Sequence, residues 1–278
     1  MNKKKPPRSA ANADPLYPEE ITTGLDTKFI GKRVMYYPEI DSTNNQALKL
    51  FKIEIENGSV IVADHQTAGR GRRHRIWVAP AGKALLFSIM ISRAGDPMKF
   101  PVYTCMAALA VAEAISNLYS LPVSVKWPND VLINEKKVCG ILTELANNKE
   151  NQQGVIVGIG INVNQTLEEL KFSVLMPATS LLIERQEFTP RGPLLREILR
   201  QFDSYYVDFL QGKTEEILRR WKGLSTLLGH PVKIVTSQGE ITGLAMDIES
   251  DGALVVRQNS GFLTRILSGD VEKIAWKG

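Results

Sequence analysis

The sequence contains few cysteines and no long apolar run. Cys105 and Cys139 are the two cysteines among 278 residues, and they show neither the spacing of a metal site nor that of a redox pair. Such sparse cysteine usage is typical of a reducing compartment. No segment approaches the ~20 apolar residues that cross a bilayer, and the basic start "MNKKKPPRSAANADP" lacks the apolar run of a secretory signal. These absences predict a cytoplasmic protein with no membrane partner.

The chain also lacks a large excess of positive charge. Lysine and arginine outnumber aspartate and glutamate by 34 to 30, which gives a net charge of +4. A surface devoted to nucleic acid would carry more, so the functional positive charge is expected to be local. The sequence shows no Ser-His-Asp or Cys-His signature either, and covalent catalysis by a side chain is therefore not predicted.

Composition divides the chain into three regions. The low-complexity residues 1–22 are predicted to form a disordered lead-in. Residues 23–228 combine strand-like and helix-like patterns and predict a large α+β domain. Residues 229–278 contain short strands separated by "SQG", "SDG" and "NSG", a pattern that predicts a small SH3-like β-barrel. With 44% apolar residues, the chain can bury a substantial core.

Apolar periodicity places the main elements of the large domain. Buried strands are predicted at 59–66, 84–91 and 154–163. The segment 104–119 is apolar nearly all round and predicts a buried helix, whereas 193–212 has the 3.6-residue period of an amphipathic helix. Another helix is predicted after "DSTN" (41–44), whose side-chain oxygens are expected to accept its first N–H groups.

The segment "TAGRGRRHRIW" (67–77) places four arginines within six positions. Gly69 and Gly71 disfavour a regular helix, at ~1 kcal/mol each relative to alanine. One interpretation is a solvated loop or a basic patch for nucleic acid. A site for a compact polyphosphate or acyl phosphate is favoured, because glycines let backbone N–H groups approach an anion and Ile76 and Trp77 anchor one end. Like charges on a glycine-containing loop also predict mobility when empty and closure around an anion.

Three further segments carry polar residues next to apolar strands. They are "KWPND" (126–130), "EKKVCGILTE" (135–144) and "GIGINVN" (158–164). Gly140, inside a predicted strand, is typical of close approach by a ligand or another backbone. Each segment alone is also explained as an exposed turn, a solvated lysine pair or a strand-end asparagine. Together with the arginine segment, they favour one site in the α+β domain.

In order and spacing, "DSTN", "QTAGRGRRHRIW", "KWPND", "KVCGILTE" and "GIGINVN" resemble the motifs of biotin–protein ligases. The resemblance extends from about Thr23 to the C-terminus. It implies an α+β fold of the class II synthetase type, with a central mixed or antiparallel sheet, flanking helices and a C-terminal SH3-like barrel. Residues 23–228 then form the catalytic domain that binds biotin and ATP.

The resemblance implies ATP-dependent ligation of biotin, through biotinoyl-5'-AMP, to a lysine of a biotin carboxyl carrier protein. Mg²⁺ is carried with ATP, and no metal site of histidine or cysteine ligands is implied. Members that also repress transcription carry an N-terminal helix-turn-helix domain. Here a short lead-in precedes "DSTN", which predicts the single-function type with no nucleic-acid partner. Members often pair through the central sheet, so a homodimer stays an open expectation.

The resemblance assigns roles to individual residues. The implied biotin-binding residues are Ser42, Thr43, Asn44, Gln66, Arg70, Gly71, Arg72 and Lys137. The implied ATP-binding residues are Arg72, Arg75, Asn129, Lys137 and Asn162, and the implied catalytic residues are Lys137, Arg72 and Arg75. Hydroxyl and amide groups suit the neutral ureido ring of biotin. Trp77 and Trp127 are expected to be structural or to form pocket walls, and direct ligand contact by Trp127 is left open.

Two other functions stay open at this point. A lipoate–protein ligase uses similar acyl-adenylate chemistry on a related fold, although "GRGRRHRIW" and "KWPND" favour biotin. A nucleic-acid-binding module would use the arginine segment and the barrel, and the small net charge argues against it.

One residue departs from the family pattern. His74 stands where many members have glycine. It is strained if the backbone there has a positive φ. Alternatively, it adds a pH-dependent charge to the loop; a role as catalytic base is not favoured.

Overall fold

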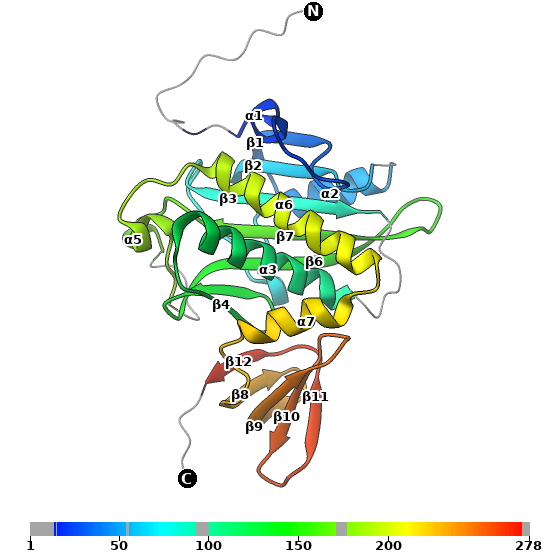
Figure 1. The fold of residues 1–278 in the computed structure, drawn as a ribbon, viewed down its shortest axis with the longest axis vertical. Coiled ribbons are helices and arrows are strands. Elements are labelled where there is room, and N and C mark those ends of the chain that lie inside the picture. Colours follow the sequence, from blue (N-terminus) through cyan, green and yellow to red (C-terminus); the bar gives the residue numbers. More distant parts are fainter. Residues whose placement is uncertain (1–13, 15, 54–55, 93–99, 171–176, 274–278) are drawn as a thin grey trace, which may run out of the picture.

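The computed structural model describes residues 14, 16–53, 56–92, 100–170 and 177–273. They form a large α+β domain and, beneath it, a small β domain (Figure 1). The α+β class and the C-terminal β module are as predicted.

Seven strands form the central sheet of the large domain. They are β1 (Val34–Ile40), β2 (Val60–Gln66), β3 (Ala84–Ile91), β4 (Val123–Lys126), β5 (Asp130–Ile133), β6 (Lys136–Asn147) and β7 (Gln153–Asn162). Their order across the sheet is β1-β2-β3-β7-β6-β5-β4. β1 runs parallel to β2 and the other neighbours are antiparallel, so the sheet is mixed. Strand β3 is buried along its whole length because helices cover both faces of the sheet.

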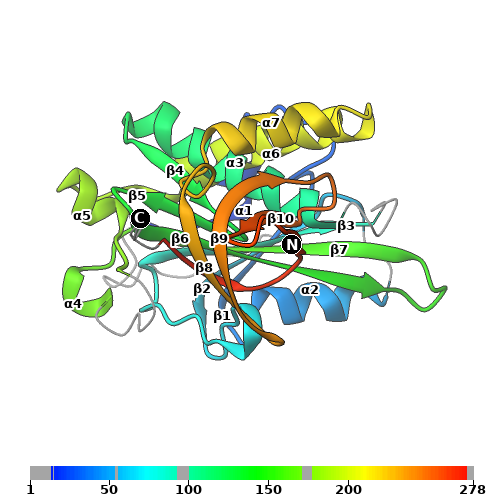
Figure 2. The ribbon, with the colours of Figure 1, turned by 90° about the horizontal axis from the view of Figure 1, so that it is seen from below.

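The helices are divided between the two faces of the sheet. α2 (Thr43–Phe51) lies on one face, and α3 (Phe100–Tyr119), α6 (Arg191–Leu210) and α7 (Thr214–Gly223) lie on the other (Figure 2). The shorter helices are α1 (Pro18–Thr22), α4 (Leu167–Leu170) and α5 (Leu181–Arg185).

Helix α3 forms the centre of the core. Contrary to the expectation from the sequence, it is long and apolar enough to cross a membrane by length and composition, yet 67% of its most apolar stretch is buried inside the protein. The amphipathic helix predicted at 193–212 is α6, which begins two residues earlier at Arg191. Pro193 therefore lies in its first turn, where a missing N–H costs little.

The folded chain begins earlier than predicted. Leu16 is 0% exposed and Ile21, in α1, is 1% exposed. Asp14 pairs with the fully buried Arg191 at 3.1 Å. The prediction that 1–22 is disordered is therefore wrong for the described part, because a few apolar side chains and one ion pair hold a segment of low-complexity composition on the domain. The rest of that stretch lies outside the described residues.

The small domain is an antiparallel five-stranded sheet. Its strands are β8 (Pro231–Thr236), β9 (Gly239–Ile248), β10 (Leu254–Gln258), β11 (Leu263–Ile266) and β12 (Asp270–Lys273), in the order β11-β10-β9-β8-β12. It lies below α7 and β4 (Figure 1). A direct contact joins the two domains, since the indole N–H of Trp127 donates to the carbonyl of Gly252 at 2.9 Å.

Candidate active site

A cavity of about 540 Å³ lies between the arginine segment, α2 and strands β5 to β7. Residues 269–272 of the small domain also line it. It brings together every residue to which the sequence assigned a role: Ser42, Thr43, Asn44, Gln66, Arg70, Gly71, Arg72, Arg75, Asn129, Lys137 and Asn162. Residues up to 120 positions apart in the sequence thus share one site.

The helix that follows "DSTN" is capped differently from the prediction. Ser42 occupies the N-cap position, but its side chain makes no capping hydrogen bond. Instead, Oε1 of Gln66 accepts from the backbone N–H of Thr43 at 2.7 Å and from its hydroxyl at 3.0 Å. The first N–H groups of a helix need an acceptor, and the end of β2 supplies it here. The Ser42 hydroxyl therefore makes no hydrogen bond to the N-terminus of the helix.

The arginine segment forms a narrow loop. Arg70 and Ile76 pair as an isolated antiparallel bridge, which we call the loop base. Inside it, the N–H of Gly71 donates to the carbonyl of Arg75 at 2.7 Å. The chain turns through a single 3-10 turn at Arg72–His74, the loop tip. The loop base is thus held by backbone pairing, and the loop tip is a separate turn beyond it.

His74 lies in the left-handed region of backbone space. Its φ is 60°, and that of Arg73 is 54°. The condition that favours glycine at this position is therefore met, and a residue with a β-carbon is strained there. The His74 side chain is exposed and is not among the residues that line the cavity, so the geometry gives no support to a role as base.

The loop tip is joined to the small domain by ion pairs. Asp270, at the start of β12, accepts from Arg73 at 2.7 Å and also from Arg75. Burial raises the pKa of Asp270, but the hydrogen bonds from both arginines outweigh this effect and hold its pKa below its usual value. The Asp270 carboxylate is thus an anion that is paired with two cations, Arg73 and Arg75. The sequence did not single out Asp270, because only the fold brings it to the loop.

Arg72 reaches from the loop tip into the cavity. Its guanidinium donates to Oδ1 of Asn129 at 3.3 Å and to the hydroxyl of Ser268 at 2.8 Å. Burial lowers the pKa of Arg72, whereas the carboxylates of Asp130 and Asp270 raise it. Arginine keeps its proton in proteins, so the direction of this pKa shift marks a partly desolvated cation. Such a cation attracts an anionic ligand more strongly than one in water.

Of the two neighbouring lysines in "EKKVCGILTE", Lys137 is the one that lines the cavity. Its Nζ lies 2.6 Å from Oδ1 of Asp130 and 5.8 Å from the centre of the Trp77 ring. Lys136 pairs instead with Glu184, at 3.6 Å, outside the cavity. Successive residues of a strand point to opposite faces, which separates the two lysines. Asp130 was missed in the sequence although it belongs to "KWPND", because its partner lies on the neighbouring strand.

The two predicted asparagines are fixed by backbone groups. Nδ2 of Asn129 donates to the carbonyl of Ile141 at 2.8 Å. Nδ2 of Asn162 donates to the carbonyl of Thr179 at 3.0 Å, and its Oδ1 accepts from Gln165 at 3.0 Å. Both side chains are therefore held in one orientation at the cavity wall.

Trp127 serves the structure as well as the cavity. It is 4% exposed, and its N–H is used by the small domain. Its ring lines the cavity. It is thus a wall residue, as expected, and its direct contact with a ligand stays open.

Two glycines in the sheet make room for Trp77. A β-carbon at Gly160 would lie 2.7 Å from the Trp77 ring, and one at Gly140 would lie 2.9 Å from it. The close approach predicted at Gly140 is therefore made by a tryptophan ring, with the Lys137 side chain at 3.2 Å. The ring thus lies over the point where Gly140 of β6 pairs with Gly160 of β7.

Gly160→Ala is expected to lower the free energy of unfolding by about 1–3 kcal/mol, because the ring must shift to admit a methyl group. Denaturant unfolding measures this change. Gly192→Ala is the matched control, since nothing lies within 4 Å of a β-carbon there and alanine favours the helix α6. Equal destabilisation by both variants would contradict the packing described.

Within the described residues, no group of three or more histidine, cysteine, aspartate or glutamate side chains is placed to hold a metal ion. The cavity is instead supplied with cations on the loop and on β6, each facing a carboxylate, an amide or a hydroxyl. Such a site suits an anionic ligand that replaces those partners.

Two family models match the chain. The biotin/lipoate A/B protein ligase family matches residues 36–162, and the biotin protein ligase C terminal domain matches residues 227–273. The bifunctional ligase/repressor BirA of Bacillus subtilis is 34% identical over 253 residues, which cover 91% of this chain and 78% of that protein. The biotin–[acetyl-CoA-carboxylase] ligase of Paracoccus denitrificans is 31% identical, over 80% of this chain and 92% of that protein.

A solved structure shows the same fold with ligands. The biotin protein ligase from Aquifex aeolicus in complex with biotin and ATP has a TM-score of 0.76 and 30% identity, over 87% of this chain and 100% of that one. The family predicted from the motifs is confirmed, and lipoate is the less well supported substrate. The chain belongs to the biotin/lipoate A/B protein ligase family and, within it, to the biotin protein ligases that act with ATP.

Proposed function

We propose that the cavity holds biotin beside the α-phosphate of ATP, with Lys137 at the junction. At one end, the uncharged Asn44 lies against Gly158. Toward the other end, Nζ of Lys137 lies 3.2 Å from the position of a β-carbon at Gly140, which pairs with Gly160. The two steps from Gly158 to Gly160 span about 7 Å of strand. This length separates the ring of biotin, at the uncharged end, from its carboxylate at the cationic end.

One observation carries the proposal: the uncharged hydrogen-bonding groups and the cations of the assigned set all line a single cavity. The ureido ring of biotin is neutral and has both donors and acceptors, which suits Ser42, Thr43 and Gln66. Phosphates and a carboxylate suit Arg72, Arg75 and Lys137.

In the first step, a carboxylate oxygen of biotin attacks the α-phosphorus of ATP, and pyrophosphate leaves. Two anions must meet, so the barrier is lowered chiefly by positive charge and by alignment. Lys137 would pass from Asp130 to the reacting oxygens, and Arg75 would pass from Asp270 to the departing phosphates. Holding the reactants in line can itself contribute ~7–11 kcal/mol.

In the second step, the amine of an acceptor lysine attacks the carbonyl carbon of biotinoyl-AMP. An amide forms, AMP leaves, and the amine gives up a proton. The mixed anhydride is reactive toward water and other amines, so it must stay enclosed until the acceptor arrives. The arginine loop is the part of the cavity wall that is suited to enclose it.

Mg²⁺ is part of this proposal as the ion carried by ATP. It prefers oxygen ligands, and the carboxylate of Asp130 with Oδ1 of Asn129 provides them at the cationic end. When bound, the ion neutralises phosphate charge.

The acceptor is proposed to be a biotin carboxyl carrier domain of a carboxylase. A homodimer is part of the proposal too. Nucleic acid is not proposed as a partner, because the three arginines Arg70, Arg72 and Arg75 line the cavity. A cytoplasmic location agrees with the two buried free cysteines. Burial raises the pKa of Cys105 to about 12, so this thiol is unreactive at neutral pH.

The function is tested by mass spectrometry of a purified carrier domain. The domain should gain one biotinyl group when it is incubated with the protein, biotin and Mg·ATP, and none when any of the three is left out. Biotin should also raise the melting temperature of the protein. A rise with lipoate and not with biotin, together with lipoyl transfer, would contradict the assignment.

A further inference from the structure

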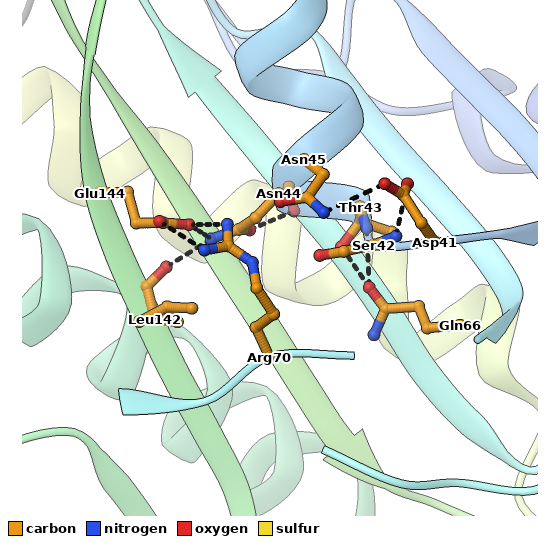
Figure 3. A network of polar contacts seen from close by, with 10 residues as sticks. Asp41, Ser42, Thr43, Asn44, Asn45, Gln66, Arg70, Leu142 and Glu144 are labelled. Carbon is orange, nitrogen blue, oxygen red and sulfur yellow. Dashed lines mark hydrogen bonds and ion pairs between the residues drawn. The ribbon is translucent and has the colours of Figure 1, made fainter. Parts of the chain in front are cut away.

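Glu144 on β6 connects two parts of the site, although no role was assigned to it. Its Oε1 accepts from Nη1 of Arg70 at 3.0 Å, and its Oε2 accepts from Nη2 of Arg70 at 2.6 Å. Oε2 also accepts from Nδ2 of Asn44, at 2.7 Å. Figure 3 shows this carboxylate on its strand, with contacts to Arg70 of the arginine loop and to Asn44 in the first turn of α2.

The position of Arg70 makes this contact important for the loop. Arg70 belongs to the loop base, where it pairs with Ile76. Its guanidinium turns toward β6, whereas Arg72 and Arg75 of the same loop reach Ser268 and Asp270 of the small domain. The loop is therefore held at its base by Glu144 and at its tip by groups that a phosphate can replace.

Asn44 fixes the orientation of the Glu144 carboxylate. Its two amide hydrogens are both used, on the carbonyl of Leu142 at 3.1 Å and on Glu144. Its Oδ1 accepts from the hydroxyl of Ser88 at 2.6 Å. A β-carbon at Gly158 would lie 2.1 Å from that oxygen, so the amide has no room to turn. A carboxylate held in this way presents both oxygens to one guanidinium, which is the strongest arrangement of this pair.

We propose that Glu144 is a positioning residue that clamps the base of the arginine loop through Arg70, so that ligand binding rearranges only the tip. The proposal rests on the proposed role of the loop in enclosing biotin and its adenylate. A base that is already ordered lowers the entropy lost when the loop closes. Glu144 does not line the cavity, so its loss should weaken biotin binding and retention of the adenylate while the rate at saturating biotin changes little.

The test is a double-mutant cycle of Glu144→Gln and Arg70→Ala. Each single variant is expected to raise KM for biotin about tenfold in pyrophosphate-release assays, with kcat nearly constant. Because the two residues act as one clamp, the double variant should be no worse than the poorer single variant. Glu216→Gln, which breaks an exposed pair with Arg219 on α7, is the matched control and should keep the parent KM.

A second measurement needs no ligand and no activity. Trypsin cleaves after arginine, and its sites in this loop become accessible when the base loosens. Glu144→Gln should increase the initial rate of cleavage within 70–75 several-fold, as mapped by mass spectrometry, at an unchanged melting temperature. Cleavage at the parent rate would overturn the proposal.

The kinetic measurements of the double-mutant cycle can also contradict the proposal. Fold-changes that multiply in the double variant, to about a hundredfold, would show that Glu144 does not act through Arg70. A Glu144→Gln variant that loses kcat and keeps KM would also overturn the clamp. Parent protein that releases no pyrophosphate with biotin and ATP would refute the proposed function instead, and the protease result would still decide the clamp.

Discussion

Lys137→Met should lower the rate of biotinoyl-AMP formation by about 10²–10³-fold, the loss typical of removing one preorganised cationic or hydrogen-bonding group from a transition state. Methionine keeps the length of the side chain and removes the charge. The Lys137 ammonium lies 2.6 Å from Asp130 and is placed where the biotin carboxylate and the α-phosphate are proposed to meet. Pyrophosphate release from Mg·ATP in the presence of biotin measures the step.

Lys136→Met provides the matched control for this prediction. The neighbouring lysine carries the same charge, lies on the same strand and pairs with Glu184 away from the cavity. Its loss should change the rate by no more than about twofold, the usual range for a surface substitution. Similar losses in both variants would show that the net charge of β6, and not the position of Lys137, supports the reaction. Melting temperatures must accompany the rates because Lys137→Met leaves the Asp130 carboxylate unpaired.

Arg72→Gly should convert the protein into a source of free biotinoyl-AMP. The substitution removes the hydrogen bonds to Asn129 and Ser268 that join the loop tip to both domains. A hydrogen bond to a charged group contributes about 1.5–3 kcal/mol, so the adenylate should escape at least about tenfold faster. Added bystander proteins should then become biotinylated on their lysines, which a streptavidin blot measures.

Arg73→Gly is the control for this second prediction. It lies next to Arg72 and loses the same charge, but it does not line the cavity. Its φ of 54° is one that glycine adopts without strain. Asp270 loses its contact with Arg73 in this variant but keeps its pair with Arg75, so bystander labelling should stay near the level of the parent. Equal labelling by the parent and by Arg72→Gly would contradict enclosure of the adenylate by the loop.

The sequence was sufficient to predict which residues share the site, because each belongs to a short motif of distinctive composition. The family resemblance implied a mixed or antiparallel sheet, and the 3.6-residue period predicted the long amphipathic helix α6. The sequence did not predict the partners of the site residues. Asp270 and Glu144 are ordinary acidic residues within their own segments, and only strand register and domain contact bring them to the arginines.

Local patterns failed where a distant group replaces a local one. The cap of α2 was assigned to "DSTN", yet Gln66 supplies the acceptor from a parallel strand. The N-terminal lead-in was assigned to disorder on composition, yet Leu16 and Asp14 find partners in the core. His74 is the opposite case. A positive φ was raised there as one possibility, from the glycine that many family members have at this position, and the structure meets that condition.

The hydrogen bond from Trp127 to Gly252 makes the small domain a mechanical support of the large one. The tryptophan begins the 127–129 turn, which contains Asn129 and leads directly to Asp130, the first residue of β5. The β9–β10 turn of the small domain therefore fixes one end of the segment that positions Asp130, the counter-ion of Lys137. The small domain thus contributes to the site in two ways, through this backbone contact and through the Asp270 carboxylate beside the arginine loop.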